Sequence, residues 1–190
     1  SIVKEEPLYM YYSPYKRAYL TMKYIIKGGK FDETDQIKVN LEDCRLIEQK
    51  FGNLQTYSDM QKEKELRTKY GRFYYQFKEG ESALDVNLRA AAFVDRLFDH
   101  FRTGYYSTRP DEKWNVVIIS HGLFMRILVK SLLRSTVKEF ECWYNYDNCE
   151  FCILEKDLDG KFHVSPKTPL KYLGYKTDYM NIDDDNVSNI

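Results

Sequence analysis

Residues 115–126 read Asn-Val-Val-Ile-Ile-Ser-His-Gly-Leu-Phe-Met-Arg. The run from Asn115 to Ile119 is apolar and β-branched, which is typical of a strand buried on both faces of a parallel sheet. An apolar helical pattern begins directly after Ser120. We therefore expect His121 and Gly122 at the carboxyl end of a central strand, at the point where a helix opens.

Open α/β sheets bind ligands at the carboxyl ends of their strands. The unpaired N–H groups in the first turn of a helix favour an anion there. A histidine at this place can be charged or neutral near neutral pH, which suits phosphate chemistry. The alternative is a strand-to-helix turn whose histidine only caps and packs.

Length and composition favour one domain without a strongly charged partner. The chain has 190 residues, 43% of them hydrophobic, enough for one sizeable core. Its formal net charge is +0, so the overall charge recruits neither nucleic acid nor an acidic membrane surface. No apolar stretch approaches the roughly 20 residues that span a bilayer. Because the chain starts at Ser1, its natural amino terminus is expected upstream, and a targeting peptide is neither found nor excluded.

The cysteines indicate reduced thiols rather than a metal site. There are four, too few for a disulfide-stapled scaffold of this length. Cys149 and Cys152 have C-x-x-C spacing but lie in an apparent strand, where side chains three apart point to opposite faces. We expect no zinc site and a cytoplasmic protein.

The pattern of apolar and turn residues predicts the other elements. Strands are expected at 8–12, 37–41, 149–155 and 161–164, and helices at 15–26, 61–69, 83–100 and 137–142. Gly28 and Gly29 are expected to stop the first helix, and Ser82 with Asp85 fits a capping box. Residues 73–77 are either strand or ordered loop. We predict a single domain over 1–178, with an insertion at about 28–80 over the sheet's edge, and a flexible polar tail over 179–190.

Two further segments carry side chains suited to phosphate. Arg17 falls in the first turn of a helix that follows a strand, where its charge opposes the helix dipole. A bidentate anion partner explains an arginine at that position, whereas the alternative is a solvated surface residue. Glu48 precedes a glycine turn at Gly52. Beside a histidine and a phosphate, such a carboxylate can hold its proton and act as a general acid.

Together the three segments resemble the histidine phosphatase superfamily of phosphoglycerate-mutase-like proteins. The family elements S-P-x-x-R-A-x-x-T, L-x-E-x-x-x-G and S-H-G occur here in that order, at residues 13–21, 46–52 and 120–122. Residues 71–82, followed by Asp85 and Arg89, are similar to the broad-range acid phosphatase subgroup. The resemblance covers about residues 8–154, and the ordered occurrence of three motifs makes it specific.

The resemblance implies an α/β fold, a three-layer αβα sandwich with a mixed, mostly parallel central sheet. It implies phosphoryl transfer through a phosphohistidine, with Arg17 and His121 on the phosphoryl oxygens and Gly122 allowing close backbone approach. Glu48 would donate a proton to the leaving oxygen and then activate water. No metal or other cofactor is implied, except a bisphosphate primer in a mutase.

The family's nucleophile belongs to an R-H-G motif, and no such motif occurs in this chain. Neither His100 nor His163 lies in one. In the family that strand lies inside the sheet, so its loss would expose the core. We therefore expect a preceding segment upstream of Ser1 that carries the nucleophile. A non-catalytic, phosphate-binding pseudoenzyme is the alternative.

Two residues bear on the substrate. Ile47 replaces an arginine often found before the glutamate, and Phe51 stands where mutases tend to carry tyrosine. The missing hydroxyl weakens the case for a mutase. A phosphatase is favoured because the middle insertion resembles the phosphatase subgroup, with phosphoglycerate mutase as the alternative. Arg72 contacts either a substrate carboxylate or a surface acid. The expected partner is a small phosphorylated metabolite rather than nucleic acid or membrane. The sequence leaves open whether the chain forms a homodimer. A nucleotide-binding domain is disfavoured because no glycine-rich phosphate loop follows a strand.

Overall fold

The computed structural model describes residues 6–54, 56–104 and 115–168. These residues form two compact units. The first unit comprises Ser1–Glu48 with Leu88–Phe124, and the second comprises Gln49–Asn87 with Met125–Ile190. The division into a single domain with an insertion stays a prediction, and the tail at 179–190 lies outside the described residues.

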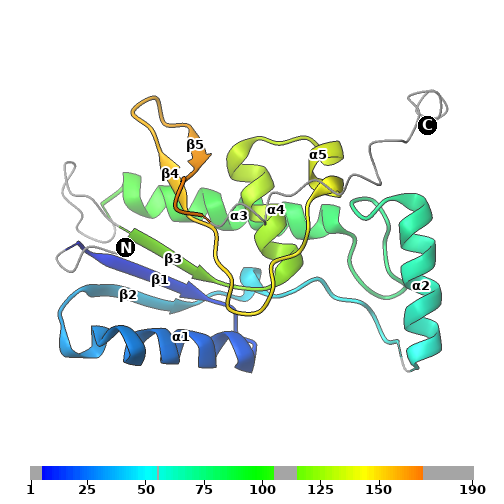
Figure 1. Cartoon of the computed structure of the whole chain (residues 1–190), viewed down its shortest axis with the longest axis horizontal. Helices are drawn as coiled ribbons and strands as arrows, with labels where there is room; N and C mark the ends of the chain where they lie inside the picture. The colour runs from blue at the N-terminus through cyan, green and yellow to red at the C-terminus, as the bar shows by residue number, and fades with distance from the viewer. Residues whose placement is uncertain (1–5, 55, 105–114, 169–190) are drawn as a thin grey trace. The chain divides into compact units, whose positions relative to one another are not determined.

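A parallel sheet forms the centre of the first unit (Figure 1). Its strands are β1 (Leu8–Tyr12), β2 (Ile37–Glu42) and β3 (Asn115–Ile119), in the order β2-β1-β3. In both pairings the strands run in the same direction, with Tyr12 beside Glu42 on one side and beside Ile119 on the other. The carboxyl ends of all three strands therefore meet at one edge of the sheet.

Strand β1 is buried on both faces, because a helix covers each face. Leu8 and Met10 pack against Ala18 and Met22 of α1 (Lys16–Gly29). On the other face, β1 meets the aromatic side chains of α3 (Ala83–Arg102). The rings of Tyr9 and Phe101 lie edge to face at 5.1 Å, and those of Tyr11 and Phe93 at 5.5 Å. The first unit is thus a three-layer αβα arrangement, as predicted.

Strand β3 corrects one expectation. Among the described residues it is an edge strand, and β1 takes the central place. Residues 115–118 are half-buried and only Ile119 is buried. A β-branched apolar run shows that a strand is covered, but it does not show how many neighbours it pairs with. No strand in the described part of the chain pairs with the second edge of β3.

Helix α1 continues through both glycines that were expected to stop it. It ends at Gly29, and its cap is Lys30, which adopts the left-handed conformation with φ of +54°. Gly29 instead allows close packing, because a Cβ there would lie 2.3 Å from the ring of Phe31. Phe31 belongs to the short 3₁₀ helix η1 (Phe31–Glu33) and packs against the core beneath the sheet.

The second unit contains helices and one hairpin. Its elements are α2 (Tyr57–Tyr70), α5 (Val137–Cys142), β4 (Leu154–Lys156) and β5 (Phe162–Val164), and most of α4 (Gly122–Leu133). Strands β4 and β5 pair antiparallel. Ser82 and Asp85 form the predicted capping box, since the Ser82 hydroxyl accepts from the Asp85 N–H at 3.1 Å and the Asp85 carboxylate accepts from the Ser82 N–H at 2.8 Å. Residues 73–77 are a loop.

The strand predicted over 149–155 is mostly wrong, because only its end is extended. Cys149 has φ of +64°, a left-handed conformation that a strand excludes, and β4 begins at Leu154. All four cysteines are free thiols. Strand alternation therefore gives no argument that the sulfurs of Cys149 and Cys152 point apart, and the reduced state of the thiols stays a prediction.

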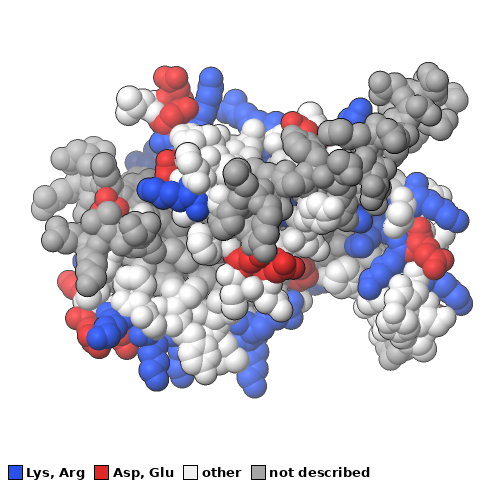
Figure 2. All heavy atoms as spheres, in the orientation of Figure 1, with Lys and Arg blue, Asp and Glu red and all other residues white. Residues whose placement is uncertain are grey.

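None of the described helices combines the length and apolarity needed for a bilayer crossing. Figure 2 shows acidic and basic side chains both distributed over the visible face, in keeping with the formal net charge of +0.

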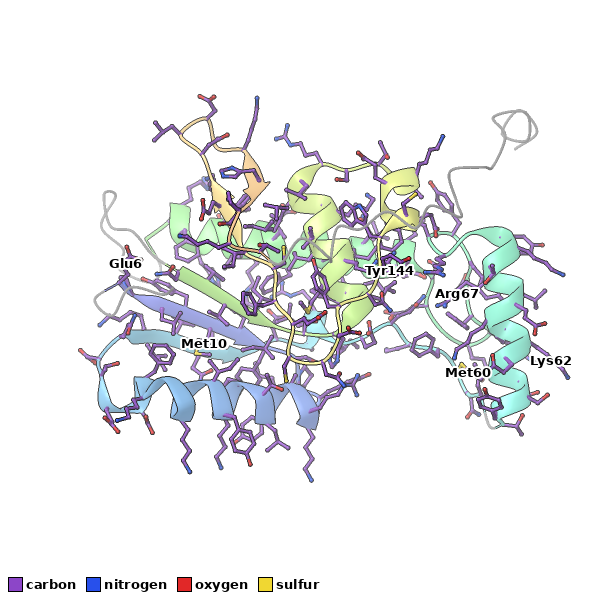
Figure 3. The ribbon with its side chains drawn as sticks, in the orientation of Figure 1. Glu6, Met10, Met60, Lys62, Arg67 and Tyr144 are labelled. Carbon is purple, nitrogen blue, oxygen red and sulfur yellow. The ribbon has the colours of Figure 1, made fainter. Side chains whose placement is uncertain are left out.

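Truncating the core beneath β1 tests the packing of the sheet on α1. Met10 is fully buried in this core (Figure 3). We expect Met10→Ala to lower the free energy of unfolding by about 2–5 kcal/mol, through lost burial and a residual cavity. Leu88→Ala on the exposed face of α3 is the control and should change it by less than about 0.5 kcal/mol. Urea denaturation measures both, and equal losses would contradict this packing.

Candidate active site

The carboxyl edge of the sheet brings together segments that are far apart in sequence. Ser13 directly follows β1, and its backbone N–H donates to the carbonyl of Ile119 at 3.0 Å. Ser120 and His121 directly follow β3. The parallel register of β1 and β3 therefore places Ser13 beside His121, although 108 positions separate them.

His121 makes a hydrogen bond through each ring nitrogen. Arg17, in the first turn of α1, donates from Nε to Nδ1 at 3.1 Å. Nε2 lies 2.8 Å from the Ser13 hydroxyl oxygen. The imidazole is buried, with 6% of its surface exposed, whereas Arg17 is exposed. Two of the predicted site residues, Arg17 and His121, are thus in direct contact.

Tyr15 forms an aromatic wall beside this pair. Its ring centroid lies 5.0 Å from that of His121, with the planes inclined by 59°. The Arg17 guanidinium carbon lies 4.9 Å from the Tyr15 ring centroid, within cation–π range. Tyr15 therefore restricts where both side chains can move.

His121 is neutral at neutral pH in the absence of an anion. Burial lowers its pKa to about 4, and the positive charges of Arg17 and Arg89 act in the same direction. A bound phosphoryl group would oppose the effect of the arginines, because its negative charge favours the imidazolium. The site can therefore accept a proton when an anion binds.

Glu48 lies at the start of α4. Its carboxylate accepts hydrogen bonds from the N–H groups of Leu123 at 3.4 Å and of Phe124 at 3.3 Å. The helix N-terminus that the sequence assigned to an anion is therefore occupied by a carboxylate of the chain itself. The Glu48 carboxylate therefore lies against the first turn of α4. This helix begins at Gly122, directly after His121.

Arg89 of α3 holds the segment that carries Glu48. One guanidinium nitrogen donates to the carbonyls of Arg45 and Ile47, both at 2.7 Å, and the other donates to the carbonyl of Glu48 at 3.1 Å. No role for Arg89 was predicted from the sequence. One signal was present, because Arg89 lies three residues after Val86 and four before Phe93 and so borders the apolar stripe of its helix.

A second contact ties the Glu48 segment to the end of β3. The hydroxyl of Ser120 donates to the carbonyl of Leu46 at 2.7 Å. Leu46 ends the 3₁₀ helix η2 (Cys44–Leu46), whose cap is the Asp43 carboxylate accepting from the Arg45 N–H at 2.9 Å. The backbone carbonyls of residues 45–48 thus all accept hydrogen bonds from the side chains of Arg89 or Ser120.

The remaining candidates belong to other elements. His100 is in the last turn of α3 and His163 is in β5. Arg72 follows α2 in the second unit, and its contact with a substrate stays a prediction. A hollow on the α3 side of the sheet is lined by Tyr11, Asp43 and Phe93, among others, and neither Arg17 nor His121 lines it. Among the described residues, no three potential ligands converge as a metal site.

Comparisons with known proteins point to one family. A family model described as the histidine phosphatase superfamily (branch 1) matches residues 2–166. Phosphoglycerate mutase-like protein AT74H of Arabidopsis thaliana is 39% identical over 155 residues, covering 82% of this chain and 54% of the relative. Broad-range acid phosphatase DET1 of Saccharomyces cerevisiae is 37% identical over 116 residues, covering 61% of this chain and 34% of the relative. The chain spans about half the length of the Arabidopsis relatives it matches.

Solved structures share the fold. A structure named mycobacterial hydrolase 1 superposes with a TM-score of 0.66 at 20% identity, covering 85% of this chain and 76% of the other. Mycobacterial glucosyl-3-phosphoglycerate phosphatase superposes with a TM-score of 0.62 at 21% identity, covering 84% and 76%. At these identities the likeness concerns the fold alone.

The pKa of His121 is directly measurable by NMR titration of its ring. We expect a value well below the ordinary 6.5, near 4, in the anion-free protein. Because the unfolded chain then binds more protons between pH 6.5 and 4, the free energy of unfolding falls as the pH is lowered through this range. His121→Gln removes the contribution of His121 to that slope. A pKa at or above 6.5 in the anion-free protein would contradict the described surroundings.

Removing the Arg89 guanidinium tests its role in holding Glu48. In Arg89→Met three carbonyls lose their donor, so we expect the free energy of unfolding to fall by about 1–3 kcal/mol. Amide exchange at Leu123 and Phe124 should also accelerate. The control is Arg102→Met, which removes an exposed ion pair with Asp99 and should change stability by less than about 0.5 kcal/mol. Unchanged exchange in Arg89→Met would show that Glu48 is held by other contacts.

Proposed function

Because the chain belongs to the histidine phosphatase superfamily, we propose that it takes part in phosphoryl transfer from a small phosphomonoester through a phosphohistidine intermediate. The observation that carries the proposal is the hydrogen bond between Arg17 and His121 at the carboxyl edge of the parallel sheet. A guanidinium and a protonatable imidazole in contact form a site that a phosphoryl group can bridge.

In this proposal Arg17 binds two phosphoryl oxygens and spreads the charge of the transition state. His121 gains a proton as the dianion approaches and donates it in a hydrogen bond to a phosphoryl oxygen. Gly122, at the start of α4, allows the backbone to come close to the anion. Positive side chains then fulfil the role that a metal ion has in other phosphoryl transferases, and no cofactor is proposed for a phosphatase.

Glu48 is proposed to protonate the leaving oxygen and then to activate water. The contacts with the Leu123 and Phe124 amides and the three Arg89 hydrogen bonds support a fixed position for this carboxyl group. A phosphoryl group at the start of α4 would compete with the carboxylate for the helix N-terminus.

The nucleophile is proposed to lie on a segment upstream of Ser1. The chain has three histidines, and His121 is the one that contacts Arg17 and Ser13. The second edge of β3, which pairs with no described strand, offers a place for a further strand beside His121. An Arg-His-Gly sequence at the end of that strand would supply the nucleophile. If the encoded upstream residues lack it, a non-catalytic phosphate-binding protein is favoured instead.

A phosphatase is proposed over a mutase. Relatives named as phosphatases support this, as does Phe51, which lacks the hydroxyl that mutases tend to carry. The alternative is phosphoglycerate mutase, and the names of the Arabidopsis relatives favour it. A mutase would need a bisphosphate primer. We also propose a cytoplasmic location, in agreement with the free thiols.

Turnover by the full-length protein separates the two activities. We expect release of inorganic phosphate from a generic phosphate ester. Interconversion of 2- and 3-phosphoglycerate that depends on a bisphosphate primer, without net phosphate release, would favour the mutase. Arg17→Ala and His121→Ala should each reduce phosphoryl transfer by about 10²-fold or more. Thr21→Val, which removes an exposed hydroxyl from the same helix, should leave it unchanged.

Replacing Glu48 with glutamine tests the proposed proton donor. Esters with poor leaving groups need protonation, so we expect Glu48→Gln to slow them by about 10²- to 10⁴-fold. Aryl phosphates with activated leaving groups need little protonation and should be affected far less. The ratio of the two rates measures the effect. Equal losses on both substrates would count against general-acid catalysis by Glu48.

A further inference from the structure

The contact between Arg17 and His121 determines which imidazole nitrogen carries the proton. The Nε of arginine bears one hydrogen and has no lone pair to offer, so it is always a donor. At 3.1 Å from Nδ1 of His121, it requires Nδ1 to accept. The single proton of the neutral imidazole must then be on Nε2. Since Nε2 lies 2.8 Å from Ser13, the serine oxygen is the acceptor.

Ser13 is well placed for this task because the main chain fixes its oxygen. Ser13 is fully buried. Its N–H continues the pairing of β1 with β3 by donating to Ile119, and Pro14 restricts the backbone that follows. The hydroxyl oxygen also accepts from the N–H of Tyr15 at 3.4 Å. The acceptor for Nε2 is thus held between the end of a central strand and the start of α1.

We propose that Ser13 is a positioning residue that, together with Arg17, fixes the tautomer of His121, so that Nδ1, on the Arg17 side, is the nitrogen that takes up a proton and donates to a phosphoryl oxygen. The last step rests on the proposed function, whereas the tautomer does not. Removing the Ser13 hydroxyl leaves a buried Nε2–H without its acceptor, which weakens the preference for the Nε2 tautomer, because the exposed Arg17 side chain alone then favours it.

Anion binding then needs no rotation of the imidazole ring. Nε2 keeps its proton and its bond to Ser13 throughout. Nδ1 takes a proton from the solvent or from the phosphate monoanion and becomes a donor. Arg17, whose side chain is exposed, redirects its Nε–H from Nδ1 to a phosphoryl oxygen. Besides Arg17, the guanidinium of Arg89 also acts electrostatically on the imidazole. Tyr15 packs against the imidazole as a neutral neighbour.

The tautomer is read by ¹⁵N NMR of the histidine rings at neutral pH, with His121→Gln used to assign the signals. In the unmodified chain we expect the proton on Nε2 in at least about nine tenths of the molecules. Ser13→Ala, in which Arg17 alone still favours the Nε2 form, should lower that fraction, and Ser13→Thr, which keeps the hydroxyl, should restore it. Thr21→Val is the control that removes an exposed hydroxyl bonded to the carbonyl of Arg17, and it should leave the tautomer unchanged.

Inorganic phosphate is the probe for the second part of the proposal. We expect Ser13→Ala to weaken phosphate binding by about 3- to 10-fold, as for one lost hydrogen bond, and Thr21→Val to leave it unchanged. An unmodified chain that carries the proton on Nδ1 would overturn the role of Ser13, even if it binds phosphate. An unmodified chain with the proton on Nε2 that binds no phosphate would instead overturn the proposed phosphate site. If Ser13→Ala does not fold, the unmodified chain and Ser13→Thr still decide the tautomer.

Discussion

The site depends on the parallel, in-register pairing of β1 with β3. This pairing brings Tyr12 beside Ile119, so the residues that follow the two strands emerge at the same edge. Ser13 and His121 meet there, and the helices that begin after each strand supply Arg17 and the N–H groups that hold Glu48. A shift of one residue between these strands would move Ser13 away from the imidazole and reverse the faces of the core side chains.

Electrostatics then define the state of the site without a ligand. His121 is buried beside two arginines, so its pKa lies near 4 and the ring is neutral. The carboxylate of Glu48 occupies the start of α4, where the helix dipole favours a negative charge. A phosphoryl group would change both conditions, because its negative charge stabilises the imidazolium and repels the carboxylate. Phosphate binding and proton uptake are therefore coupled in our proposal.

The sequence predicted the parts of this arrangement that follow from strand ends and motif spacing. His121 follows the apolar strand β3, and Arg17 lies in the first turn of the helix that follows β1, so their meeting at one edge could be expected. Hydrogen bonds to backbone carbonyls leave no such pattern, and the role of Arg89 in holding the Glu48 turn was therefore missed. The position of β3 at the edge of the described sheet was also missed, because apolar composition does not show how many strands pair with a given strand. The left-handed conformation of Cys149, a non-glycine residue, had no signal in the sequence.

A crystal structure of the full-length protein with vanadate tests the central claim most directly. The account predicts the anion in contact with both the guanidinium of Arg17 and the imidazole of His121, beside the start of α4. Vanadate bound elsewhere at saturating concentration, with the bond between Arg17 and His121 intact, would contradict it.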